Sequence, residues 1–285
     1  MNFRGKSQKD LYFKLILLPL LKKSQTMKLR VTCQIVYECP ANVPLILMLR
    51  PQSGAAQQIL CEDFSLTPIT TFSEYNDIYG NLCQRLISPI GNFRILSSAL
   101  VETSDKIDVN FAARTLSIEG LPDFALIYLL PSRYCESDKF LFMAGEIIRN
   151  FQTGYEKVNA ICQWVRSNVV YEYGYSSSSS SACDINLSRI GVCRDFSHLC
   201  ISLCRAVNIP ARMVVGYLYD LEPMDLHAWF EVYLQNQWFT FDATQVEPKG
   251  NRVVMAYGRD ASDVAFATQF GNIFLKNMHV SVERA

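Results

Sequence analysis

The spacing of the hydrophobic residues changes from a period of two to a helical period near residue 122, which constrains the fold more than any other feature. From residue 28 onward five apolar side chains alternate with polar ones: Leu29, Val31, Cys33, Ile35 and Tyr37. This alternation is typical of a strand with one buried face. Further strand-like stretches, separated by prolines and glycines, follow at residues 45–49, 58–66, 72–79 and 93–102. The spacing predicts an antiparallel β-sandwich over residues 27–122.

Beyond residue 122 the apolar spacing becomes helical, and we expect a second domain over residues 123–285. A helix is predicted over residues 138–150. Thr153 and Glu156 form a Thr-x-x-Glu capping box at the start of another helix, which should end near Val169. The six serines of residues 176–181 carry neither apolar period nor charge and predict a loop. The fold class is therefore α+β.

Composition and charge exclude several classes of protein. Hydrophobic residues make up 49% of the chain, enough to build globular cores. The 27 Lys and Arg balance the 27 Asp and Glu, so no nucleic-acid or acidic membrane partner is expected. The apolar run in residues 11–21 is too short to span a bilayer and lacks a small-x-small cleavage site. Residues 1–26 are expected to be a disordered or helical extension.

Cysteine usage favours a cytoplasmic protein. Of the ten cysteines, Cys162, Cys200 and Cys204 fall on helix-periodic apolar stripes, where cysteine behaves as a small buried hydrophobe. Their spacing, taken with that of Cys193, matches no zinc-binding pattern, so no metal or other cofactor is expected. Secretion is the alternative if residues 1–26 act as a signal peptide.

Cys193 stands immediately before an apolar helical stripe and after Gly191, which places it at a helix N-terminus. Backbone amides and the positive end of the helix dipole stabilise a thiolate there, and the thiolate is the nucleophilic form of cysteine. His198 is close in sequence, but it is expected to be structural or to support the active-site residues from behind. The sequence thus offers one candidate nucleophile.

A cysteine nucleophile needs a base and a group that orients the base. His227 begins a strand rich in aromatic and β-branched residues, and Asp242 ends the next one after the short connection 235–237. If the two strands pair, the start of one lies beside the end of the other. His227 and Asp242 should then interact directly.

Four stretches resemble the bacterial transglutaminase-like family, which belongs to the transglutaminase-like cysteine peptidase superfamily. They are Gly-Val-Cys193-Arg-Asp-Phe, Arg205-Ala-Val-Asn-Ile-Pro-Ala-Arg212, His227-Ala-Trp-Phe-Glu-Val and Trp-Phe-Thr-Phe-Asp242-Ala-Thr. The resemblance runs from about residue 134 to 270, and the first half is similar to the β domain of many members. It implies a papain-like α+β catalytic core in which Cys193 is the nucleophile, His227 the base and then the acid, and Asp242 the orienting residue.

The resemblance also implies an oxyanion hole, for which the amide of Cys193 supplies one donor. The second donor in this family is an upstream side chain. Trp164, Tyr173 and Tyr175 are candidates, with Tyr175 preferred because it enters the site from a loop and Trp164 expected to pack on its helix.

The predicted function is cysteine-dependent acyl transfer on peptide or side-chain amide bonds, through a thioester on Cys193 and with a peptide or protein substrate. Water as acceptor would make the protein a peptidase or amidase, whereas an amine would make it a protein-glutamine transglutaminase. Hydrolysis is preferred, since no calcium loop of the Asp-x-Asp-x-Asp-Gly kind is present. A non-enzymatic peptide-binding or assembly module is the alternative from another class.

Overall fold

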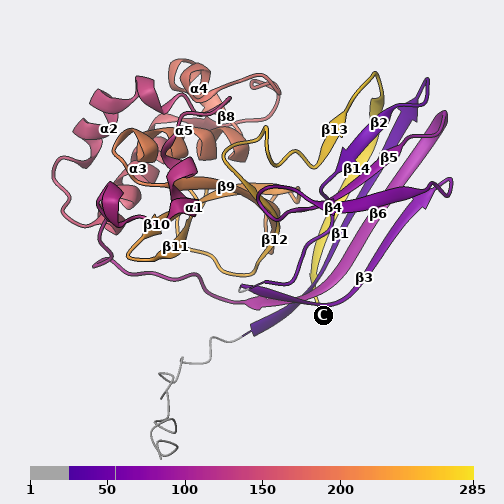
Figure 1. The fold of residues 1–285 in the computed structure, drawn as a ribbon, viewed down its shortest axis with the longest axis horizontal. Coiled ribbons are helices and arrows are strands. Elements are labelled where there is room, and N and C mark those ends of the chain that lie inside the picture. The colour runs from indigo at the N-terminus through magenta and orange to yellow at the C-terminus, as the bar shows by residue number, and fades with distance from the viewer. Residues whose placement is uncertain (1–25, 55) are drawn as a thin grey trace, which may run out of the picture.

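The computed structural model describes residues 26–54 and 56–285, and a sandwich of two antiparallel sheets forms one side of it (Figure 1). The sheet orders are β14-β1-β6-β3 and β13-β2-β5-β4. Both sheets contribute side chains to one core, where Leu29, Leu45 and Phe93 are fully buried. The strands are β1 (Thr26–Cys39), β2 (Pro44–Leu47), β3 (Gln57–Thr67), β4 (Phe72–Asn76), β5 (Leu82–Ile87), β6 (Gly91–Ser104), β13 (Ala267–Gln269) and β14 (Phe274–Arg284).

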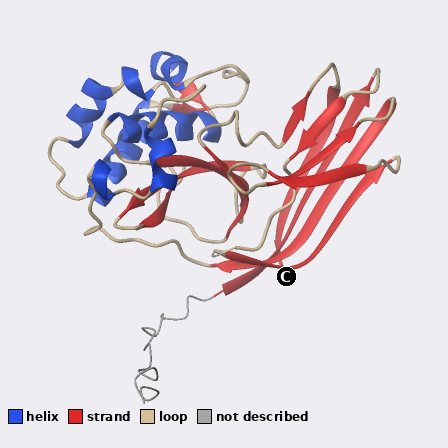
Figure 2. Ribbon diagram, in the orientation of Figure 1, coloured by secondary structure: helices blue, strands red, loops and turns tan. Residues whose placement is uncertain are grey.

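The other side of the molecule is an α+β core in which helices pack on a sheet of order β11-β10-β9-β12 (Figure 2). The antiparallel strands are β9 (Ala211–Leu218), β10 (His227–Leu234), β11 (Gln237–Phe241) and β12 (Arg252–Gly258). The α-helices are α1 (Asp123–Leu126), α2 (Leu141–Ile148), α3 (Gly154–Asn168), α4 (Ala182–Ser188) and α5 (Cys193–Ala206). Three 3-10 turns, η1 (Ile118–Gly120), η2 (Ile127–Leu129) and η3 (Ser137–Lys139), and a parallel pair, β7 (Val170–Tyr171) with β8 (Ile190–Gly191), complete the described part.

The C-terminal segment returns to the sandwich, which differs from the expected division of the chain. The second domain was predicted to run from residue 123 to 285, yet β14 pairs antiparallel with β1, with Leu29 opposite Arg284. Likewise, β13 pairs with β2. The yellow β14 lies beside the indigo β1 in Figure 1. Residues 267–284 therefore complete the two sheets of the first half, a long-range pairing that local spacing does not reveal.

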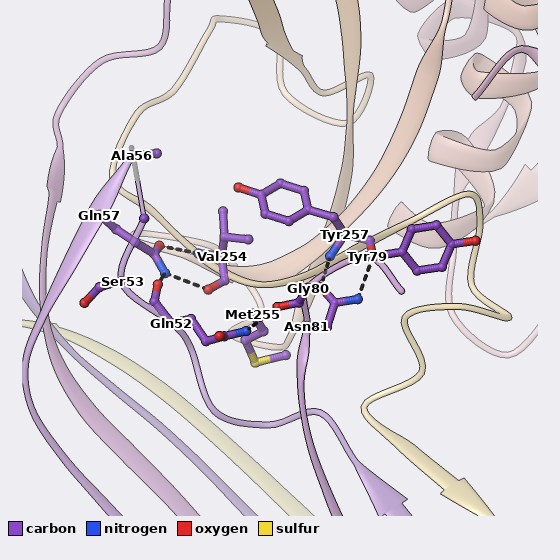
Figure 3. A pocket seen from close by; sticks show the side chains of 11 residues that line it. Gln52, Ser53, Ala56, Gln57, Tyr79, Gly80, Asn81, Val254, Met255 and Tyr257 are labelled. Atoms are coloured by element: carbon purple, nitrogen blue, oxygen red, sulfur yellow. Dashed lines mark hydrogen bonds between the residues drawn. The ribbon is translucent and has the colours of Figure 1, made fainter. Parts of the chain in front are cut away.

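Two side-chain amides join the sandwich to the outer edge of β12 (Figure 3). Gln57 Nε2 donates to the carbonyl of Val254 at 2.8 Å, and its Oε1 accepts from the amide of Val254 at 2.7 Å. Asn81 forms the same pair of bonds with Tyr257, at 2.7 and 2.8 Å. Each carboxamide thus replaces a missing neighbouring strand and satisfies an edge peptide group. A cavity of about 160 Å³ lies between the two contacts.

Most locally encoded elements agree with the sequence. The capping box of α3 forms, with Glu156 N donating to Thr153 Oγ1 at 3.2 Å and Thr153 N donating to Glu156 Oε2 at 3.1 Å. The helix predicted over 138–150 is shorter, because η3 precedes α2. The serine run is a loop until Ser181, which is the N-cap of the unpredicted α4. Strand β5 was also not predicted.

The predicted N-terminal extension lies outside the described residues except for Thr26, which already belongs to β1. In the part of the chain that the structure describes, no helix is long and apolar enough to cross a membrane.

Candidate active site

Cys193 is the first residue of α5, the helix that packs against the central sheet, as its sequence context predicted. The helix is buried from residue 195 to 205, polar residues included. Ser197 and Ser202 donate to carbonyls one turn earlier, at 2.9 and 2.8 Å, and the Arg205 guanidinium donates to the carbonyl of Ala211. Because these hydroxyl and guanidinium groups are paired and the apolar face of the helix is packed, α5 is a rigid base for the Cys193 thiol.

The turn into α5 is fixed by Asp195, which is fully buried. Its Oδ2 accepts from the amide of Val192 at 2.9 Å and from the Ser176 hydroxyl, and its Oδ1 accepts from Arg194 at 2.8 and 3.0 Å. A Cβ on Gly191 would lie 2.8 Å from the Asp195 Cβ. Gly191 is therefore required for this close approach, and half-buried Cys193 is held at the helix start.

His227 and Asp242 come together across the β10–β11 hairpin. Gln235 and Asn236, with φ of 47° and 65°, form its two-residue turn. In the register, Phe230 lies opposite Phe241, so His227 and Asp242 meet diagonally and Asp242 lies one residue past the end of β11. His227 Nε2 is 2.7 Å from Asp242 Oδ2. The predicted contact is present in the structure.

Asp242 has two further partners that the sequence reading did not identify. Its Oδ1 accepts from the amide and the hydroxyl of Thr244, at 2.9 and 2.7 Å. Its Oδ2 accepts from Arg252 Nη2 at 2.9 Å. Thr244 could have been found, because a Thr two residues after an Asp commonly bonds its carboxylate. Arg252 could not, since its place follows from the pairing of β12 with β9.

The pair is ionised in its buried setting. Burial by itself disfavours the charge on Asp242, but His227, Arg252 and the hydrogen bonds outweigh it and hold its pKa well below the usual range. Burial also opposes protonation of His227, yet Asp242 and the neighbouring Cys193 raise its pKa to about 9. An imidazolium on His227 is thus stable at neutral pH.

The nitrogen of His227 that remains for Cys193 is Nδ1. Asp242 occupies Nε2, and Nδ1 is buried with no hydrogen-bond partner among the described residues. Cys193 is close enough to raise the pKa of His227, although thiol and ring do not meet in full hydrogen-bond geometry. Catalytic contacts are often loose before substrate binds. The three candidate side chains therefore converge from α5, β10 and the end of β11.

The predicted oxyanion donors receive no support from the structure and stay predictions. Tyr175 is 66% exposed, and Trp164 packs under the Arg189 guanidinium, 4.9 Å from its ring centre. Neither forms a hydrogen bond to Cys193 within residues 26–54 and 56–285. Instead, Tyr171 approaches Cys193: burial, Cys193 and the hydroxyl of Tyr173 at 3.4 Å raise the pKa of Tyr171. Tyr173, the third candidate, lies beside it.

The other histidines are separate from this group. His198 is fully buried, stacks on Tyr134 at 5.1 Å and accepts the amide of Ala261 at 3.1 Å, and burial lowers its pKa to about 4. This fits the structural role predicted for it. His279 is exposed on β14. Within the described ranges, no group of three or more His, Cys, Asp or Glu residues is arranged to hold a metal.

Three further charged residues of the core have structural partners. Arg212 forms a partly buried ion pair with Glu231 at 2.6 Å. Arg259 binds Asp263 at 2.9 Å. Asp260 accepts a hydrogen bond from the amide of Tyr134 at 2.8 Å.

A family model for the transglutaminase-like superfamily matches residues 142–243, from α2 to the residue after Asp242. A Mycobacterium leprae protein named as uncharacterized is 28% identical over 247 residues, which cover 81% of this chain and 87% of that protein. The crystal structure of a Cytophaga hutchinsonii protein, described as a "Putative Cysteine Protease", matches with a TM-score of 0.87 and 37% identity. It covers 92% of this chain and 91% of the other, so the likeness includes both the sandwich and the core.

Proposed function

This chain belongs to the transglutaminase-like superfamily and is a cysteine-dependent enzyme of that group, and we propose that it hydrolyses amide bonds in a peptide or protein. The observation that carries the proposal is the orientation of His227. Its Nε2 is bound to Asp242 at 2.7 Å, and its Nδ1 is left for the Cys193 thiol. This is the arrangement that a cysteine nucleophile requires of its base.

The proposed reaction starts from an ion pair in which His227 Nδ1 already holds the proton of the Cys193 thiol. The sulfur attacks the carbonyl carbon of the amide, and the carbonyl oxygen becomes an oxyanion. The Cys193 amide at the start of α5 is one donor to this oxyanion, and the Tyr171 hydroxyl is our candidate for the second. The His227 imidazolium then protonates the leaving nitrogen, so the amine departs and a thioester remains on Cys193.

Water completes the proposed cycle. His227 Nδ1 removes a proton from a water molecule, the resulting hydroxide attacks the thioester carbon, and the thiolate leaves and is reprotonated. Transfer to an amine would require a site that excludes water. Trp229 and Trp238 do not line such a site: Trp229 is 1% exposed beside His227, and Trp238 packs on Tyr233 in the core. The tyrosines at residues 171, 173 and 175 are 40%, 48% and 66% exposed, which favours access of water.

Selective labelling tests the nucleophile. Iodoacetamide near pH 6, followed by mass mapping, should modify Cys193 before the other nine thiols. Burial raises the pKa of Cys135 to about 12, and burial and Glu136 raise the pKa of Cys183. Preferential labelling of Cys135 or Cys183 would contradict the assignment.

Turnover tests the reaction. A mixture of peptides should be cleaved by the wild-type protein and by Cys183→Ala, which serves as the matched cysteine control, but not by Cys193→Ala. Product masses with millimolar primary amine present should show mostly the free acid. A predominance of amide adducts that depends on Cys193 would assign transamidation instead.

A further inference from the structure

Arg252, the first residue of β12, lies behind the Asp242 carboxylate and is 6% exposed. Its Nη2 donates to Asp242 Oδ2 at 2.9 Å, and its Nε donates to the carbonyl of Lys249 at 3.0 Å. Its guanidinium carbon stands 4.9 Å from the ring centre of Trp229, which in turn stacks beside His227 with ring centres 6.1 Å apart. Arg252 therefore contacts both Asp242, which binds His227, and Trp229, which stacks beside it.

The backbone around Arg252 is held by the sandwich. Thr103 Oγ1, near the end of β6, donates to the carbonyl of Arg252 at 2.7 Å, and the amide of Asn251 donates to the carbonyl of Ser104 at 2.8 Å. A Cβ on Gly250 would lie 2.1 Å from the Asp105 backbone, so the two segments are in close contact. The position of the guanidinium thus depends on β6, a strand with no residue among the proposed catalytic three.

The same Asp242 oxygen accepts from both His227 and Arg252. Arg252 is thus a second cation on this oxygen. Its positive charge weakens the attraction between the carboxylate and the His227 imidazolium, and its hydrogen bond restricts rotation of the carboxylate. Other charged or titratable groups near the pair are Cys193 and Cys200 on α5, Tyr155, Cys162 and Arg166 on α3, Asp225 before β10, and Glu247 at the small cavity behind Asp242. Of the described residues, only His227 and Arg252 form ion pairs with Asp242.

We propose that Arg252 is a positioning residue, and that the β-sandwich fixes the geometry of the active site by holding Arg252 in place. It holds Asp242 in place for His227 and, by sharing the carboxylate, limits how tightly His227 retains the proton that the leaving group must receive. This inference rests on the proposed roles of Cys193, His227 and Asp242. It gives the sandwich a part in the chemistry beyond that of a scaffold.

Titration of His227 tests the inference without any substrate. The chain has three histidines, at positions 198, 227 and 279, so NMR of protein labelled at the imidazole Cε1 resolves each one, with His→Gln variants for assignment. Arg252→Met should move the His227 midpoint upward from about 9 by at least about one pH unit, because the two cations contact the same carboxylate oxygen and repel each other at short distance. Arg252→Lys, which keeps the charge, should restore most of the difference.

Arg212→Met is the matched control, because Arg212 is also a partly buried, ion-paired arginine of the same sheet. It should lower the thermal midpoint without moving the His227 titration. If Arg252→Met also lowers the thermal midpoint but leaves the His227 titration unchanged, the inference is overturned. Should Arg252→Met fail to fold, Arg252→Gln removes the same charge and carries the same expectation.

The role of the sandwich is tested by Thr103→Val, with Thr32→Val as its control in the same sheet. Thr32 bonds Ser98 at 3.0 Å, between β1 and β6. Thr103→Val should move the His227 midpoint upward by a smaller amount and lower turnover severalfold, whereas Thr32→Val should change neither. An unchanged His227 midpoint in Thr103→Val would show that the sandwich does not influence the active site.

The proposed function can fail separately from this inference. If Arg252→Met shifts the His227 midpoint as expected but turnover does not depend on Cys193, the proposed function is refuted.

Discussion

The substitution Asp242→Asn probes the buried contacts that define the site. Asp242 accepts four hydrogen bonds, two from Thr244 on Oδ1 and one each from His227 and Arg252 on Oδ2. An asparagine that keeps the Thr244 bonds with its oxygen turns its NH₂ group toward two other donors. The variant therefore leaves the Arg252 charge without its counter-ion, and His227 loses the acceptor that fixes its tautomer.

The expected loss of stability can be worked out from these contacts. Removing one partner of a buried ion pair costs about 3–5 kcal/mol. The pairing raises the pKa of His227 from 6.5 to about 9, a difference of about 2.5 pH units, and at about 1.4 kcal/mol per pH unit this corresponds to about 3.5 kcal/mol. Because the pKa of the folded state is raised, this contribution is complete below about pH 6.5 and is lost as the pH rises through about 9.

Urea unfolding of wild-type protein and Asp242→Asn at pH 6 and pH 10 measures this contribution. The difference in unfolding free energy between the two proteins should shrink by about 3.5 kcal/mol at the higher pH, leaving the part due to Arg252. Turnover at pH 7 should fall by about 10⁴-fold, since the imidazole adopts the wrong tautomer. A stability difference that does not change with pH would refute the assignment of a buried imidazolium to His227.

Two further predictions concern the join between the sandwich and the core and the oxyanion donor. Gln57→Ala and Asn81→Ala should each lower the unfolding free energy by about 2 kcal/mol, because each leaves a peptide group of β12 unpaired. Calorimetry checks this against Gln58→Ala, a substitution at the exposed neighbour of Gln57 on β3. Tyr171→Phe should lower kcat by about 10²-fold with little change in KM, whereas Tyr175→Phe should leave both unchanged; equal kinetics of the two variants would exclude Tyr171 as the donor.

The parts of the site that depend on nearby residues could be predicted from the sequence. The start of α5 at Cys193 follows from the apolar stripe behind it, and the meeting of His227 with Asp242 follows from two strands joined by a two-residue turn. The capping box at Thr153 is likewise local. In each case the partners lie within one element or one hairpin, so pattern and spacing determine the contact.

The parts that depend on distant residues could not be predicted. Arg252 reaches Asp242 because β12 pairs with β9, and the bulge between Val254 and Ala256 sets the register of that pairing. Tyr171 approaches Cys193 because β7 pairs with β8, which directly precedes α5. The oxyanion candidates Tyr175 and Trp164 were chosen because they precede Cys193 in the sequence. Sequence order does not reveal that the parallel pairing of β7 with β8 brings a different side chain, Tyr171, toward Cys193.

The pairing of β14 with β1 has a consequence for how the protein is made. β1 lies between β6 and β14, and residues 29 and 284 are register partners. On the ribosome, β1 can pair with β6 early, but its other edge stays open until β14 has been synthesised. A long strand with an open edge is prone to join other chains. Any fragment that ends before β14, including one cut at the apparent boundary near residue 122, should therefore aggregate in the cell.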